Sequence, residues 1–303
     1  MTTTLSVRLV LAVIATGGCM QSCFAQSETF LERWKGATPM KLLGPDTPKD
    51  SLLTPEVLPL NIPVPYSNVG RLYFHSTTTG GVITKHWCTA QFVAPNVVLT
   101  AAHCIVDEDG TSKHDQFQLL TEDKRQFSFN NCQRVNPDWH PPFQADDILY
   151  SVRSDYGFLQ SATPTTGTTY TVGSTSAAVP PKSSKDVEIF GYRIKFNTDG
   201  TPVKDADGNY VPNEMVSMDP GKPSKDGDIL FQHVYSVPAA TAGSSESLRG
   251  TSGGAWIEDP SPNRVVSITS AAWSPAFGGK PRIYGPYLEG AKAMINFVAS
   301  GCN

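Results

Sequence analysis

The sequence predicts an all-β protein, and three observations support this class. The chain of 303 residues contains 25 glycines and 24 prolines, and long Ser/Thr-rich tracts separate its apolar runs. Those runs are short and bounded by turn signals, which is typical of many short strands rather than of a helix bundle. The length is sufficient for a substantial core in one or two compact units.

The charge pattern argues against one class of partner. The formal net charge is −4, and no cluster of lysines or arginines appears. A nucleic-acid-binding surface needs such a cluster, so we expect no nucleic-acid partner.

Residues 1–25 are predicted to be a secretory signal peptide. Arg8 precedes the apolar run 9–16, and a small-x-small cleavage context ends at Ala25. The apolar run is too short to span a bilayer, and no other segment of the chain is apolar enough to do so. We therefore expect a secreted, extracellular protein with no membrane span. A periplasmic location is the less favoured alternative.

Removal of the signal peptide would leave four of the six cysteines, an even number that predicts two disulfides in an exported chain. Four cysteines allow three pairings. Cys88 with Cys104 is the favoured pair, because a Pro-Asn turn joins the two strands that carry them. Cys132 and Cys302 then remain for each other.

Two alternatives for the cysteines stay open. A lipoprotein signal would make Cys19 a lipid anchor, although the residue three places before it is not apolar as usual. A zinc site could use His86, Cys88, His103 and Cys104, but export disfavours it.

The patterned core follows a Pro-rich stretch, residues 26–66, which we interpret as a propeptide or an N-terminal arm wrapped on the domain. Apolar runs separated by turns then continue to a Thr/Ser/Gly-rich connector, residues 161–178, which has almost no large apolar residues. This connector marks a boundary between two halves, residues 67–165 and 166–303.

Turn signals at residues 197–200 and 205–209 predict a long hairpin insertion in the second half. Asp205 and Asp207 are typical of a calcium loop, but the third acidic ligand and the distal glutamate are missing. Ordinary turn chemistry is the favoured interpretation of these aspartates.

The C-terminal segment has helical periodicity. Leu288, Ala291, Ile295 and Val298 recur at helical spacing. We expect a helix over residues 287–299 that docks on the second half.

Three motifs contain the residue types that acyl transfer through a serine requires. His103 follows the apolar run 97–99, Asp155 begins Asp-Tyr-Gly-Phe-Leu, and Ser252 lies in Gly-Thr-Ser-Gly-Gly. The reaction needs a base beside the serine, a carboxylate that orients the base, and backbone donors for the oxyanion. Glycines around Ser252 allow a sharp turn that leaves the amides of Gly250 and Ser252 free to face a carbonyl oxygen.

The order of these residues excludes another hydrolase class. The Gly-x-Ser-x-Gly pattern also matches the nucleophile elbow of α/β-hydrolases, in which the histidine follows the serine. None of the six histidines follows Ser252. The observed order is His, Asp, Ser.

With all three motifs present, the chain resembles the trypsin/chymotrypsin superfamily of serine peptidases, over roughly residues 66–298. Within it the chain is most similar to the secreted glutamyl-endopeptidase-like and bacterial trypsin-like branch. The resemblance implies two perpendicular six-stranded antiparallel β-barrels, chymotrypsin-like, with a C-terminal helix. It implies that His103 and Asp155 come from the first barrel and Ser252 from the second.

Two aspartates compete for the carboxylate role. Asp147 lies 44 residues after His103, closer to the spacing common in this family than the 52 residues that separate His103 from Asp155. Asp155 matches the residue pattern better, and extra loop residues cost little free energy. We therefore favour Asp155.

The resemblance also bears on substrate binding and activation. Ser270 matches the serine of the strand that pairs with substrate backbone. Glu246 lies six residues before Ser252, where trypsin-like enzymes place their acidic pocket residue, but Arg249 could neutralise it. Trypsin has an aspartate at the position of Thr251 that binds a new N-terminal ammonium, so activation by that route is not expected here.

We expect a secreted serine endopeptidase that acts on polypeptides as a monomer, with no cofactor and no metal. The alternative is a catalytically silent homologue of the same fold that binds a protein partner through its cleft. An intact set of His103, Asp155 and Ser252 argues against the alternative.

Overall fold

The computed structural model divides the chain into a unit of residues 1–35 and a second unit, residues 36–303, which contains all the elements discussed below. The structure describes residues 33, 35, 38–39, 66–107, 112–142, 148–173, 187–195, 197, 201–221, 224–225, 234–238, 248–258, 263–273, 282–288 and 290–303. The predicted signal peptide, most of the predicted arm, Cys19, Asp147 and Glu246 lie outside these residues.

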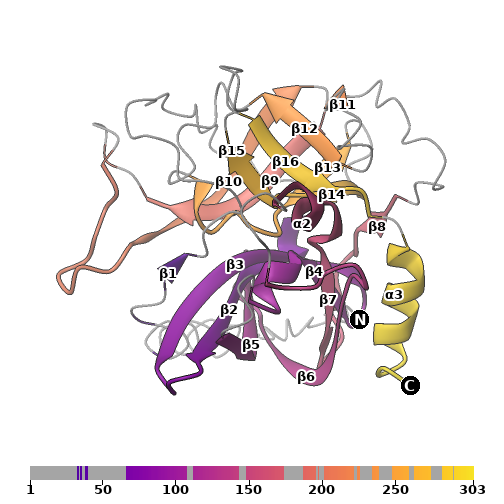
Figure 1. Ribbon diagram of the computed structural model, residues 1–303, viewed down its shortest axis with the longest axis horizontal. Coiled ribbons are helices and arrows are strands. Elements are labelled where there is room, and N and C mark those ends of the chain that lie inside the picture. Colours follow the sequence, from indigo (N-terminus) through magenta and orange to yellow (C-terminus); the bar gives the residue numbers. More distant parts are fainter. Residues whose placement is uncertain are drawn as a thin grey trace, which may run out of the picture. The chain divides into compact units, whose positions relative to one another are not determined.

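The first half forms a closed barrel of six strands, β2 to β7 (Figure 1). Every pairing around the barrel is antiparallel, and β4 pairs with both β7 and β3, which closes it. Apolar side chains such as Leu72, Phe74 and Phe92 fill the interior and have no exposed surface. The strands are β2 (Val69–Thr78), β3 (Ile83–Ala94), β4 (Val97–Thr100), β5 (Ser112–Thr121), β6 (Gln126–Val135) and β7 (Gly157–Ser161).

Part of the predicted N-terminal arm joins this barrel. Strand β1 (Thr38–Pro39) pairs in parallel with β3, where it faces His86 and Trp87. The short 3-10 helix η1 (Tyr66–Asn68) then leads directly into β2.

The second half forms two sheets over the described residues, of five and four strands. The hydroxyl of Ser267 donates to the carbonyl of Pro286 at 2.8 Å and so links the sheets. The first sheet contains β8 (Thr171–Val172), β9 (Val187–Ile194), β10 (Pro212–Gly221), β13 (Ala255–Glu258) and β14 (Arg264–Ile268). The second contains β11 (Ser224–Lys225), β12 (Val234–Pro238), β15 (Ala271–Trp273) and β16 (Arg282–Pro286). The predicted all-β, chymotrypsin-like class is confirmed.

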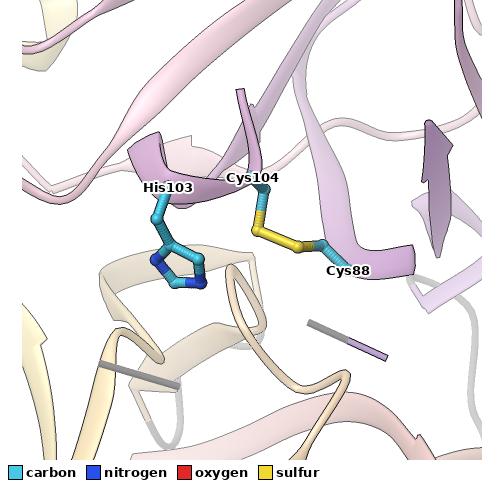
Figure 2. A group of neighbouring side chains, drawn as sticks. All are labelled: Cys88, His103 and Cys104. Carbon is cyan, nitrogen blue, oxygen red and sulfur yellow. A yellow bond between two sulfur atoms is a disulfide. The ribbon is translucent and has the colours of Figure 1, made fainter. Parts of the chain in front are cut away.

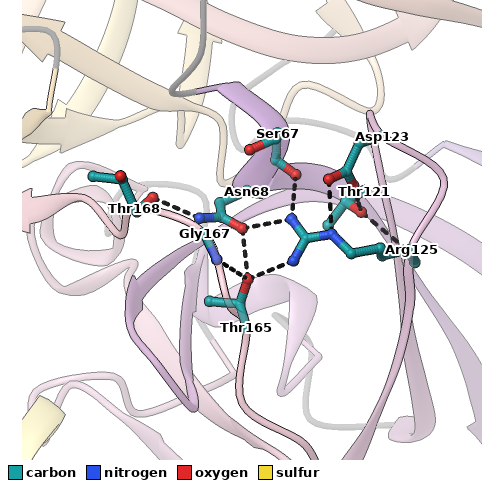
Figure 3. A network of polar contacts seen from close by, with 8 residues as sticks. All are labelled: Ser67, Asn68, Thr121, Asp123, Arg125, Thr165, Gly167 and Thr168. Atoms are coloured by element: carbon teal, nitrogen blue, oxygen red, sulfur yellow. Dashed lines mark hydrogen bonds and ion pairs between the residues drawn. The ribbon is translucent and has the colours of Figure 1, made fainter. Parts of the chain in front are cut away.

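A partly buried polar network anchors the start of the first barrel to the connector between the halves (Figure 3). The Arg125 guanidinium, in the β5–β6 turn, pairs with Asp123 at 2.7 Å and donates to the Asn68 side chain at 2.9 Å. It also donates to the hydroxyl of Thr165 at 2.8 Å, and that hydroxyl donates to Asn68 Oδ1 at 2.7 Å. Arg125 therefore fixes both ends of the first half from one turn.

The C-terminal helix is shorter than predicted and docks on the other half. Helix α3 (Ala291–Ala299) begins after Gly290, which has a φ of 69° and interrupts the helical pattern seen in the sequence. Its buried residues Met294 and Val298 belong to the core that contains Leu159 of the first barrel, and the helix contacts β6 and β7. The expected docking on the second half is wrong, because periodicity shows which face of a helix is apolar but not what covers it.

Helix α2 (Ile148–Ser154) was not predicted. Seven residues are too few to establish a helical period in the sequence. Among the described residues, no helix is long and apolar enough to cross a membrane.

The hairpin insertion after β9 closes through ordinary turn chemistry. The Asp205 carboxylate accepts the backbone amides of Asp207 and Asn209 at 3.0 and 2.9 Å. Lys204 and Tyr210 pair on either side of the turn. Such hydrogen bonds explain an aspartate at this position.

Both predicted disulfides are present. Cys88 of β3 is bonded to Cys104 in η2 (Ala102–Cys104), and Cys132 of β6 is bonded to Cys302. The second bond ties the segment after α3 to the first barrel, which agrees with the observed docking of the helix.

We predict that replacing Cys132 and Cys302 together by serine lowers the free energy of unfolding by about 2–5 kcal/mol, because the cross-link restricts the unfolded chain. The bond joins residues 170 apart, whereas Cys88 and Cys104 are 16 apart. Guanidinium unfolding followed by tryptophan fluorescence measures the change. An unaltered unfolding midpoint would contradict the prediction.

Candidate active site

His103 and Asp155 meet at one end of the first barrel. Strands β4 and β7 are antiparallel neighbours, with Thr100 opposite Gly157, so the segment after β4 that contains His103 and the segment before β7 that contains Asp155 lie at the same edge. His103 Nδ1 lies 2.7 Å from Asp155 Oδ2, and the His103 backbone amide donates to Asp155 Oδ1 at 2.9 Å. Neither residue has exposed surface.

Ser270 contributes a third hydrogen bond to the same carboxylate. Its hydroxyl donates to Asp155 Oδ2 at 2.6 Å from the segment between β14 and β15. Burial of a carboxylate is costly unless hydrogen bonds replace its water, and these three bonds do so. The Ser270 side chain therefore supports the His103–Asp155 pair, in addition to any role of its backbone.

Ser252 lies in a tight loop whose conformation depends on glycine. Gly250 and Gly253 have φ values of 88° and 81°, in the left-handed region. A β-carbon on Gly253 would collide with the Thr89 carbonyl. The loop is closed internally, because the amide and hydroxyl of Thr251 both donate to the Leu248 carbonyl, at 3.0 and 2.6 Å.

Several polar groups around Ser252 take no part in the hydrogen bonds that hold the loop among the described residues. Among the described residues, the amides of Gly250 and Ser252 have no backbone acceptor. The buried hydroxyl of Ser252 likewise has no hydrogen-bond partner in that part of the chain. Gly253 donates to Thr269, so the loop is held beside the segment that carries Ser270.

Comparison with known proteins identifies the family of this chain. The model of the trypsin family matches residues 66–293. The chain belongs to the trypsin family. No curated protein sequence gives a significant match.

Two solved structures with a similar fold are both described as proteases. The protease Anisep from Arthrobacter nicotinovorans has a TM-score of 0.50 and 16% identity, covering 78% of this chain and 98% of its own. The thermostable serine protease AL20 from an extremophilic microorganism has a TM-score of 0.49 and 18% identity, covering 80% and 100% respectively. At such identity, the similarity to Anisep extends to the fold alone.

In this trypsin-family chain, the cysteines of the zinc site that the sequence left open as an alternative are not available as ligands. Cys88, His103 and Cys104 do place possible ligand atoms within 4.8 Å of one another (Figure 2). The two sulfurs are bonded to each other, however, and zinc is bound by thiolates. The fourth residue of the alternative zinc site, His86, is instead paired with Thr84: its Nε2 lies 2.8 Å from the Thr84 hydroxyl.

The motifs did not identify the residues that hold the Ser252 loop from the first barrel. Thr89 and Gln91 of β3 both donate hydrogen bonds to this loop. The available signal was the alternation of polar residues, at 89 and 91, with apolar residues at 90 and 92, in the part of β3 (residues 87–93) that is buried throughout. A polar residue inside a barrel strand needs a buried partner.

We predict that Asp155→Asn lowers the rate of labelling by a fluorophosphonate, a reagent for activated serines, on the order of 10³-fold near neutral pH. An amide has one acceptor oxygen, whereas the carboxylate accepts three hydrogen bonds on two oxygens. The histidine then loses its preferred tautomer. Asp147→Asn is the matched control and should label nearly normally; the reverse result would transfer the role to Asp147.

Proposed function

We propose that this trypsin-family protein is a secreted serine endopeptidase that cleaves polypeptides through an acyl-enzyme. The observation that supports this most is the buried His103–Asp155 pair, which carries a third hydrogen bond from Ser270. In a protein of this family, that arrangement prepares a histidine to act as a base.

In the proposed reaction, Ser252 Oγ attacks the carbonyl carbon of the scissile peptide while His103 Nε2 accepts its proton. The amides of Gly250 and Ser252 donate to the resulting oxyanion. Asp155 stabilises the imidazolium, which then protonates the leaving amine as the C–N bond breaks. A water molecule, deprotonated by His103, hydrolyses the ester and restores the Ser252 hydroxyl.

The proposal of secretion rests on the predicted signal peptide and on the two disulfides. Disulfides persist in oxidising compartments and are rare where thiols are kept reduced. We expect the mature protein to act as a monomer.

One observation favours the second candidate, a catalytically silent homologue that binds a protein partner. The side chains of Ser252 and His103 have no exposed surface, so this conformation does not present them to a substrate. The two candidates differ in whether the folded protein reacts with a mechanism-based probe.

We predict that a fluorophosphonate labels the purified protein at Ser252, as mapped by peptide mass spectrometry. Ser252→Ala and His103→Ala should each abolish labelling and lower peptidase activity by several orders of magnitude, because the two residues act as one unit. Circular dichroism checks that both variants remain folded. An unlabelled wild-type protein, correctly folded and oxidised, would favour the silent homologue.

A further inference from the structure

Strand β3 of the first barrel donates hydrogen bonds to three backbone carbonyl groups of the Ser252 loop. The Thr89 hydroxyl donates to the carbonyl of Gly250 at 2.9 Å, and the Thr89 amide donates to the carbonyl of Ser252 at 2.8 Å. Gln91 Nε2 donates to the carbonyl of Gly253 at 3.1 Å. The position of the loop therefore depends on a strand from the other half of the protein.

The Thr89 hydroxyl both donates and accepts a hydrogen bond where strand β3 meets the Ser252 loop. The Thr89 side chain has no exposed surface, and its hydroxyl accepts the backbone amide of Tyr192, in β9, at 2.9 Å. One hydroxyl thus joins three segments, namely β3, β9 and the Ser252 loop. Removing it would leave the Gly250 carbonyl and the Tyr192 amide buried without this partner, which is costly.

The Thr89 hydroxyl restrains the peptide group next to a proposed oxyanion donor. The peptide between Gly250 and Thr251 is held at its carbonyl by Thr89 and at its amide by the Leu248 carbonyl. Gly250 has no side chain and a φ of 88°, so its own conformation is weakly restrained. Because the peptide group that follows Gly250 is held at both its carbonyl and its amide, the Gly250 N–H can point in a smaller range of directions.

The same strand also determines where the base lies. Cys88, adjacent to Thr89, is bonded to Cys104, which is adjacent to His103 (Figure 2). Two consecutive residues of β3 therefore restrain both the histidine segment and the serine loop. A displacement of about 1 Å between reacting groups is enough to slow a reaction strongly.

We propose that Thr89 is a positioning residue for the reaction: its hydroxyl holds the Gly250 peptide so that the Gly250 amide faces the developing oxyanion. This inference rests on the proposed function. Thr89 itself does not touch the substrate.

The test compares Thr89→Val, which keeps the shape and loses the hydroxyl, with Thr121→Val as a matched control. Thr121 is also buried, and among the described residues its hydroxyl bonds only to Asp123 and Arg125, within its own turn. We expect Thr89→Val to lower the maximal rate of fluorophosphonate labelling about 10–100-fold, less than the loss of a whole oxyanion donor, with an unchanged half-saturating concentration. Thr121→Val should label like the wild type.

A second pair keeps the test decisive if Thr89→Val does not fold. Thr89→Ala and Thr89→Ser both lose the methyl group, and they differ only in the hydroxyl. Recovery of the labelling rate in Thr89→Ser but not in Thr89→Ala, both measured below their melting temperatures, supports the proposal. Equal rates in all folded variants overturn it while the proposed function stands, whereas an unlabelled wild type overturns both.

Discussion

The fully buried carboxylate of Asp155 is the constraint on which the site depends. A charge without water needs several donors at once, and Asp155 has three. Two come from His103, through the turn after β4, and the third comes from Ser270 in the second half. The carboxylate is thus satisfied only when the first barrel is closed and the second half is docked against it.

The junction between the halves follows the same principle. Tyr192 of β9 receives a hydrogen bond from the Trp87 indole on its carbonyl and donates its hydroxyl to Glu122 at 2.5 Å. Burial and the neighbouring Glu122 raise the pKa of Tyr192 well above its usual value, so the phenol stays protonated. The Arg71 guanidinium lies 4.8 Å from the centre of the Tyr192 ring. Directional polar contacts of this kind fix how the two halves meet, which apolar packing alone specifies less precisely.

Among the described residues, hydrogen bonds stabilise the Ser252 loop where the resemblance to trypsin would suggest an ion pair. Thr251 occupies the position of the trypsin aspartate, and its hydroxyl bonds to Leu248 within the loop. The Thr251 side chain also lies against Gly191, where a β-carbon would collide with it. All the residues that make these contacts, and those of β3 that hold the loop, lie within residues 66–293, the part of the chain that matches the trypsin family.

The sequence by itself determined the fold class, the family and the chain order His103, Asp155, Ser252, because each depends on local patterns or on residue types that few folds combine. It also favoured the two disulfide pairs that the structure contains, the second of them by elimination. It did not determine the docking of α3, the helix α2, the bond from Ser270 to Asp155 or the contacts of Thr89. Helix α2 is too short to establish a helical period in the sequence. The other three features depend on which segments, distant in the chain, meet after folding. Thr89 and Gly250 are 161 residues apart, and Ser270 and Asp155 are 115 apart. In the sequence, a hydrogen bond over such a separation is indicated only by a polar residue in an otherwise apolar segment. Which residue is its partner depends on the tertiary structure.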